Sequence, residues 1–246
     1  RKAAMKIATE GVKKIAVTPA DIKEFLGVVQ YTDSEHMRQN EVGVVNGLAW
    51  TQVGGEILEV EVNVMDGTGK LELTGNLGTV MQESAKTALS CLRSRAGELG
   101  IEKNFYKTKD IHFPEGAVPK DGPSAGIAIT TAMLSALTGK KVRKDVAMTG
   151  EVTLRGRVLP IGGLKEKTMA ALRNGIETVI IPRENEKDLE EIDQTVRRKL
   201  RFVPVSRVEE VFSEALVSEG KKTAAQPEEM PLLAVQSCTA RPDLRV

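Results

Sequence analysis

The chain has 246 residues, 41% of them hydrophobic, which is enough for one domain with a sizeable core and a smaller appendage. Its 35 basic and 34 acidic residues leave a net charge of +1, and aromatic residues make up 3%, so the composition argues against nucleic-acid binding and attachment to acidic membranes. Two cysteines and two histidines, far apart, cannot build a disulfide framework or a zinc site, and no apolar run of about 18 residues predicts a membrane span, so we expect a cytoplasmic protein.

Residues 1–27 are predicted to form a small helical unit. Its second helix, TPADIKEFLG, has Thr18 as the N-cap, Pro19 at the first helical position and Gly27 beyond its end. The chain begins with arginine, and its first helix lacks an N-cap, so we expect a segment of a longer protein, with a processed start as the alternative. Residues 28–42 are polar and are predicted to be a linker.

The main domain is predicted to span residues 43–217 and to open with antiparallel strands. In EILEVEVNVM, Val60 and Val62 alternate with Glu59 and Glu61, which is typical of a strand with one solvated face. DGTGK then turns the chain and LELTG returns it. A long helix follows, and DIHF forms a short strand.

From residue 124 onward, helices alternate with strands and hairpins. DVAMTGEVTL and RGRVLP read as a hairpin, and TVIIP and RFVPV as strands. Helices are predicted at 124–138, 164–174, 184–192 and 207–217. The order predicts an α+β or mixed α/β fold, with antiparallel hairpins followed by alternating helices and strands. Residues 218–246 lose this periodicity and are predicted to be a flexible tail.

Ser124 lies in the motif PKDGPSAG, at the first turn of a helix rich in small apolar residues. First-turn N–H groups, here those of Ser124, Ala125 and Gly126, have no intrahelical acceptor and stabilise negative charge. The charge could be a phosphate or the oxyanion of an acyl-transfer intermediate. Gly126 is expected to leave room for a ligand. The alternative is that Ser124 only helps to cap the helix.

A nucleophilic serine needs a base, and the sequence offers two. His112, oriented by Asp121, is one, although His112 could equally be an ordinary strand residue or a hydrogen-bond donor that orients the loop. The other is Lys165, which heads an apolar stripe with Met169, Leu172 and Ile176 at helical spacing.

Lys167, two residues later, shares its face with Ala170, Ala171 and Asn174, a more neutral surface. Lys165 could extend past the helix end into water. If it is buried instead, desolvation lowers the pKa of its amine and leaves a neutral base. Thr149, on the neighbouring hairpin, is a candidate to hold that amine.

Three motifs in order, PKDGPSAG, MTGEVTLRGRVLPIGGLKEK and VIIPRENEKDLEEI, resemble the proteolytic domain of the Lon family of ATP-dependent proteases, bacterial type. The resemblance runs to about residue 217 and implies a serine endopeptidase with a Ser-Lys dyad and no metal. It places the nucleophile on Ser124 and the general base on Lys165. Thr149 matches the family's threonine near the lysine, and Asp121 and Glu151 match acidic residues that line the site.

The resemblance also implies how the rest of the protein is organised. Residues 1–27 look like the end of the small helical domain of an AAA+ ATPase module. ATP and Mg²⁺ would bind the missing core of that module, so no cofactor is expected in this chain. DGTGK, residues 66–70, lacks the spacing of a phosphate-binding loop. The family implies unfolded protein or peptide substrates and a hexameric ring.

One departure from the family concerns DIHFPEGA, which is two residues shorter than usual and lacks a second histidine. Shortening the strand by about 6.6 Å could displace the loop that carries Ser124. A catalytically inert assembly domain therefore stays open as an alternative. A phosphate-binding or small-molecule kinase-like domain, using the glycine-rich helix start at 122–126, is the other.

Overall fold

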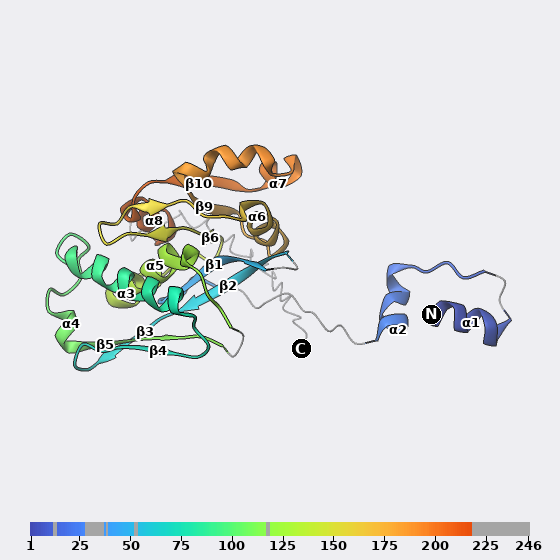
Figure 1. Ribbon diagram of the computed structural model, residues 1–246, viewed down its shortest axis with the longest axis horizontal. Helices are drawn as coiled ribbons and strands as arrows, with labels where there is room; N and C mark the ends of the chain where they lie inside the picture. Colours follow the sequence, from blue (N-terminus) through green and yellow to red (C-terminus); the bar gives the residue numbers. More distant parts are fainter. Residues whose placement is uncertain (12–13, 28–36, 38, 52–53, 117–118, 218–246) are drawn as a thin grey trace, which may run out of the picture.

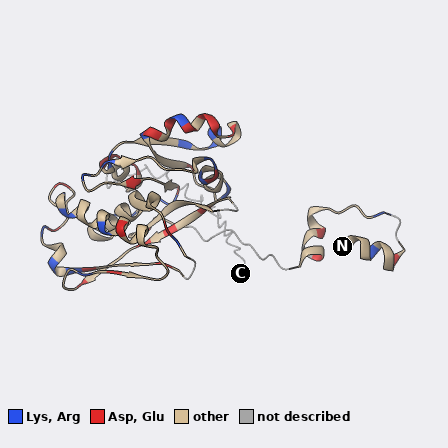
Figure 2. Cartoon of the chain, in the orientation of Figure 1, with Lys and Arg blue, Asp and Glu red and all other residues tan. Residues whose placement is uncertain are grey.

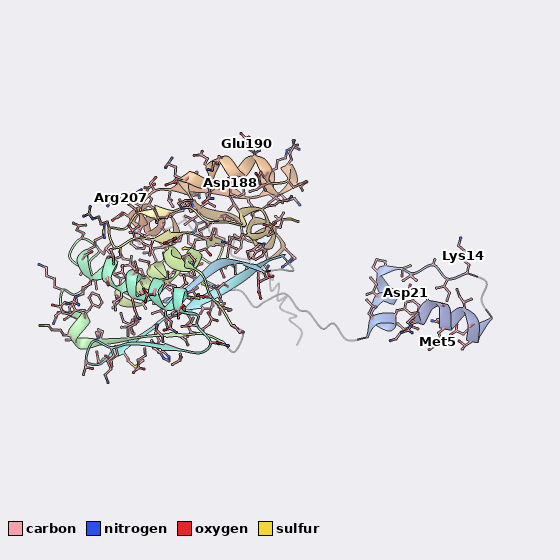
Figure 3. The ribbon with its side chains drawn as sticks, viewed as in Figure 1. Met5, Lys14, Asp21, Asp188, Glu190 and Arg207 are labelled. Carbon is pink, nitrogen blue, oxygen red and sulfur yellow. The ribbon has the colours of Figure 1, made fainter. Side chains whose placement is uncertain are left out.

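The computed structural model describes residues 1–11, 14–27, 37, 39–51, 54–116 and 119–217 (Figure 1). The amino-terminal unit consists of α1 (Lys2–Glu10), η1 (Pro19–Asp21) and α2 (Ile22–Leu26). Its second helix starts as predicted, because Thr18 donates both its N–H and its hydroxyl to Oδ2 of Asp21, at 2.8 and 2.6 Å. Figure 3 labels Met5 and Asp21 in this unit. Its assignment to an ATPase module stays a prediction.

The main body is built on a five-stranded sheet in the order β10-β9-β6-β1-β2. Neighbours are parallel except β1 and β2, which form an antiparallel hairpin at one edge. The strands are β1 (Val44–Thr51), β2 (Gly54–Glu61), β6 (Val146–Met148), β9 (Thr178–Pro182) and β10 (Arg201–Val205). Parallel strands place their carboxyl ends at one edge of a sheet, which is where ligands bind in open α/β folds.

The predicted alternation of buried apolar and exposed polar residues in EILEVEVNVM is confirmed, but this segment spans two sheets. Val60 and Val62 are buried while Glu59 and Glu61 are exposed. The chain leaves the large sheet after β2 and enters a three-stranded sheet, ordered β3-β5-β4. Its strands are β3 (Asn63–Asp66), β4 (Leu71–Thr74) and β5 (Lys109–Pro114). The prediction that DGTGK turns the chain and LELTG returns it is confirmed, because β3 is antiparallel and β4 parallel to β5, which lies between them.

The loop DGTGK, residues 66–70, binds a carboxylate side chain of the protein itself, that of Asp110. The N–H groups of Thr68 and Lys70 donate to Oδ1 of Asp110, at 2.7 and 2.8 Å. These backbone hydrogen bonds lower the pKa of Asp110. A carboxylate of β5 therefore takes the place that a phosphate has in a phosphate-binding loop, consistent with the sequence prediction.

Helices cover both faces of the large sheet, and each face has its own hydrophobic core (Figure 1). One core contains residues of α3 (Thr79–Ser94), α5 (Gly126–Thr138) and α8 (Val208–Ala215). The other contains residues of α6 (Leu164–Arg173) and α7 (Gln194–Lys199), with η3 (Arg183–Glu191) packed on it. Within β9, Ile180 faces the first core and Val179 and Ile181 the second, so the strand is buried on both faces. Four short elements complete the fold: α4 (Phe105–Thr108), η2 (Pro123–Ala125), β7 (Glu151–Val152) and β8 (Val158–Leu159).

Some sequence expectations need correction. One residue of the predicted linker is packed onto the body: Met37 is buried, and its N–H donates to Oδ1 of buried Asn46 at 3.2 Å. Residues 28–36, 38 and 218–246 lie outside the described residues, so the rest of the linker and the tail stay predictions. The helix expected at 184–192 is a 3₁₀ helix, and α7 was not predicted.

Figure 2 shows acidic and basic residues interspersed along the helices of the main body rather than separated by sign. None of the helices in the described ranges is long and apolar enough to span a membrane.

Candidate active site

A cavity of about 840 Å³ lies beside the end of β1 and residues 56–58 of β2, and it brings together the two motifs that the sequence singled out. One wall is the segment from Pro119 to Ala125, which includes Ser124. Another part of the wall is formed by residues 160–163, and Lys167 of α6 also lines the cavity. Trp50, at the end of β1, lies at the rim with 56% of its surface exposed.

The carbonyl of Ser124 is fixed by the chain that follows β6. Gly150 donates its N–H to the Ser124 oxygen at 2.8 Å, and Ile127 donates its N–H to the Gly150 oxygen at 3.0 Å. The start of α5 is thereby joined to the β6–β7 connection. This pairing positions Ser124 beside Thr149, the residue before Gly150.

The expected oxyanion donors are only partly available. Gly126 donates its N–H to the carbonyl of Pro123, because the first turn is a 3₁₀ helix, so the prediction of a free N–H at Gly126 is wrong. For Ser124 and Ala125 the oxyanion role stays a prediction.

The lack of a side chain at Gly126, which was expected to leave room for a ligand, has a different structural role. A Cβ at this position would lie 2.8 Å from the main-chain nitrogen of Val152 and 3.2 Å from the oxygen of Gly150. The missing side chain therefore lets α5 approach the β6–β7 connection, rather than making room for a ligand.

Lys167 is the buried lysine of the site. Only 2% of its surface is exposed, and its Nζ donates a hydrogen bond to Oγ1 of Thr149 at 3.1 Å. Burial lowers the pKa of Lys167 from 10.5 to about 8. At a pKa of about 8, about one amine in ten is neutral at pH 7, compared with fewer than about one in a thousand for an ordinary lysine.

The prediction that Lys165 is the buried base is wrong. Lys165 is exposed, and Met169, on its predicted apolar stripe, is 52% exposed. Two residues are about 200° apart around an α-helix, so Lys165 and Lys167 cannot face the same way. The stripe that is buried runs at helical spacing through Leu164, Lys167, Thr168 and Ala171. This i, i+3, i+4, i+7 pattern was the sequence signal for Lys167, weakened because alanine and threonine are poor markers of a core.

Thr149 is completely buried and connects the lysine to the serine segment. Its Oγ1 accepts from Lys167 Nζ, and its hydroxyl donates to the main-chain oxygen of Ser124 at 3.3 Å. Thr149 therefore holds a lysine amine, as expected, but the lysine is Lys167.

Asp121 lines the cavity and anchors the serine loop to a helix. Its Oδ1 accepts from the N–H of Met81, in the first turn of α3, at 3.1 Å, and from the N–H of Gly122 at 3.0 Å. A Cβ on Gly78 would collide with this carboxylate side chain at 2.1 Å. Asp121 thus caps α3 from a distant segment.

The other two residues predicted at the site lie elsewhere. Glu151, in β7, pairs with Leu159 of β8 and is not among the described residues that line the cavity. His112, in β5, is also not among the described residues that line the cavity. Its Nε2 lies 2.8 Å from Oγ1 of Thr74. The geometry therefore brings Ser124, Thr149, Lys167 and Asp121 together, and His112, the histidine of the described ranges, is not among them.

Comparisons with known proteins match most of the chain to one family. The family profile described as the Lon protease (S16) C-terminal proteolytic domain matches residues 16–218. The chain is 56% identical over 219 residues to the Lon protease of Finegoldia magna, covering 88% of the chain and 28% of the relative. It is 54% identical over 221 residues to Lon protease 1 of Myxococcus xanthus, covering 89% and 27%. Against Lon protease 1 of Bacillus subtilis it is 53% identical over 223 residues, covering 90% and 29%. The chain thus spans a little over a quarter of these relatives' length.

Proposed function

The chain belongs to the family of Lon protease (S16) C-terminal proteolytic domains, and on that premise we propose that it hydrolyses peptide bonds through a dyad of Ser124 and Lys167. The observation that carries the proposal is the buried amine of Lys167, which is hydrogen-bonded to Thr149 and lines the same cavity as Ser124. Family membership favours this reaction over the kinase-like alternative.

The reaction proceeds by acyl transfer. The neutral amine of Lys167 accepts the proton of the Ser124 hydroxyl as Oγ bonds to the peptide carbonyl carbon. The resulting oxyanion is stabilised by first-turn N–H groups, of which those of Ser124 and Ala125 are the candidates. Collapse of this intermediate breaks the C–N bond, and Lys167 returns the proton to the leaving amine. Water, deprotonated by the same amine, then hydrolyses the serine ester.

Desolvation makes this chemistry feasible near neutral pH. The pKa of about 8 keeps a useful fraction of Lys167 neutral, while the protonated form remains acidic enough to protonate the leaving group. The cause of the lowered pKa of Lys167 is burial. The other charged residues that line the cavity do not contribute to it; they are Glu56, Lys120 and Asp121.

The finer features of the function are proposed from family membership. Substrates are unfolded proteins or peptides, the chains assemble as hexamers, and the protein acts in the cytoplasm. ATP and Mg²⁺ bind an ATPase module of the family and not these 246 residues, which carry no cofactor of their own. Hydrolysis by this chain is therefore expected without nucleotide.

A labelling experiment tests the proposal. The chain is incubated with a fluorogenic peptide or casein, with and without a serine-directed phosphonofluoridate, and the adduct is mapped by mass spectrometry. We expect turnover and a single adduct on Ser124, both lost in Ser124→Ala and kept in the control Ser90→Ala, an exposed serine on α3 that bonds the Lys86 carbonyl. A folded chain with neither turnover nor adduct would leave the inert assembly domain as the correct alternative.

A further inference from the structure

Asn185, in the motif VIIPRENEKDLEEI, is buried on the far side of the cavity wall. Only 2% of its surface is exposed. It lies in η3, three residues beyond the end of β9, and packs beside α6. The dyad chemistry described above does not use this residue.

The side-chain amide of Asn185 binds both peptide groups of a single residue, Ile161. The N–H of Ile161 donates to Oδ1 at 2.9 Å, and Nδ2 donates to the Ile161 oxygen at 2.8 Å. Nδ2 also donates to Oδ2 of Asp188 at 2.6 Å, and Figure 3 labels Asp188 in this part of the molecule. The one acceptor and two donors of the amide group are therefore all engaged, and its orientation is fixed.

Ile161 is followed in this wall by Gly162 and Gly163. Glycine has no Cβ, so these two residues restrict the backbone conformation least. Gly163 has φ 69° and serves as the N-cap of α6, beneath the ring of Trp50, whose Cδ1 lies 3.0 Å from where a Cβ would be. A Cβ on Gly162 would meet nothing within 4 Å. Two glycines in succession give the chain much freedom unless a neighbour restrains it.

The start of α6 carries this restraint to the lysine. Gly163 accepts the N–H of Lys167 at 3.2 Å, so Lys167 lies in the first turn after the glycine pair. Any drift of Ile161 would shift that turn with respect to Thr149, which belongs to a different segment. A displacement of about 1 Å in such a group can cost about a hundredfold in rate.

We propose that Asn185 is a positioning residue of the protease, which clamps Ile161 and thereby fixes the wall at Gly162–Gly163 and the placement of Lys167 against Thr149. The inference rests on the proposed function, since it concerns the same dyad. It assigns a role to the third sequence motif, which the dyad alone leaves unexplained.

The test compares Asn185→Ala with Asn174→Ala. Asn174 is the matched control, because it is also buried and adjoins the other end of α6, but within the described ranges its Nδ2 bonds only the Ala170 carbonyl of that helix. The measurements are kcat/KM for a fluorogenic peptide between pH 6 and 10, the rate of phosphonofluoridate labelling at Ser124, and the melting temperature.

For Asn185→Ala we expect kcat/KM to fall by about ten- to a hundredfold, with most of the loss in kcat. Loosening of the wall also admits water to Lys167, so the inflection of the pH profile should move up from about 8 by about one unit. Asn174→Ala should keep the inflection of the wild-type chain, whatever its loss of melting temperature. A residue with a merely structural role would change the melting temperature without moving the inflection.

Asn185→Asp keeps the inference testable if the alanine variant does not fold. It preserves side-chain volume and the acceptor for the Ile161 N–H, but it loses the donor to the Ile161 oxygen and places a second carboxylate beside Asp188. The same upward shift is expected. The inference is overturned if folded variants at Asn185 keep an inflection near 8 and kcat/KM within about twofold of wild type, or if Asn174→Ala reproduces the shift. A wild-type chain without labelling at Ser124 would instead contradict the proposed function itself.

Discussion

The Nζ of Lys167 donates to Oγ1 of Thr149 at 3.1 Å, and the Thr149 hydroxyl donates onward to the main-chain oxygen of Ser124 at 3.3 Å. The single hydroxyl proton of Thr149 is thus used on a fixed carbonyl, so toward the lysine the threonine acts as an acceptor. A neutral amine that donates to Thr149 keeps its lone pair directed elsewhere. That lone pair is what the Ser124 hydroxyl requires.

Two lysines on one helix provide a direct test of the base. Lys167→Met should lower kcat/KM by on the order of a thousandfold or more, because it removes the proton acceptor of the proposed dyad. Lys165→Met, on the exposed face of α6, should stay within about twofold of wild type. Peptide hydrolysis by both variants checks this, with circular dichroism as the folding control. Equal activity of the two variants would contradict the assignment.

The stability of the chain should depend on pH through Lys167. Its pKa falls from 10.5 in the unfolded chain to about 8 in the folded one, so below pH 8 the fold bears a penalty of up to about 3 kcal/mol for a buried ammonium. Between pH 8 and 10.5 only the folded chain releases the proton, and this contribution to stability rises with pH. Lys167→Met should therefore be more stable than wild type at pH 7, by a margin that shrinks as the pH rises through this window.

Urea unfolding of wild type and Lys167→Met at several pH values measures that margin. The difference between the two chains cancels the titration of other groups. A margin that stays constant from pH 7 to 10 would mean that the pKa of Lys167 is not lowered in the fold.

Thr149→Val removes the acceptor of the Lys167 amine while keeping the side-chain volume. We expect a loss of about 1–3 kcal/mol in the free energy of unfolding, because a buried amine is left unpaired. We also expect kcat to fall by about ten- to a hundredfold, because the amine is no longer held. Thr131→Val is the control, since Thr131 is equally buried but its hydroxyl donates to the Ile127 carbonyl of its own helix, at 2.7 Å. Similar kinetics for the two variants would argue against a role for Thr149 in the dyad.

Gly126→Ala should damage the packing on which Ser124 depends. Its Cβ would lie 2.8 Å from the Val152 nitrogen, so α5 must move away from the β6–β7 connection, at a cost of about 1–3 kcal/mol in the free energy of unfolding. Gly116→Ala meets nothing within 4 Å and should change stability by less than about 0.5 kcal/mol. Thermal unfolding of both variants is measured together with labelling at Ser124. A loss of stability in Gly126→Ala but not in Gly116→Ala indicates that Gly126 allows close packing, rather than leaving room for a ligand as first expected.

Much of the fold could be predicted because local signals agreed with it. β10 has the bounds expected for RFVPV, and the helix after Thr18 begins where its capping residues indicated. The order of β3, β5 and β4 could not be predicted, because the pairing of strands is decided by contacts between residues far apart in the chain. The strand alternation was visible, but its division between two sheets was not.

For the site, the sequence by itself determined that a serine begins a helix, that a lysine-bearing helix follows two glycines, and which family the motifs resemble. Only the tertiary structure decided which lysine serves. Helical periodicity gives the angle between Lys165 and Lys167, but it does not say which face packs inward when small residues such as Ala170 and Ala171 form the buried side. The bonds of Asn185 to Ile161 and of Asp121 to Met81 join segments 24 and 40 residues apart. Such contacts arise only when the whole core assembles, because no local pattern specifies them.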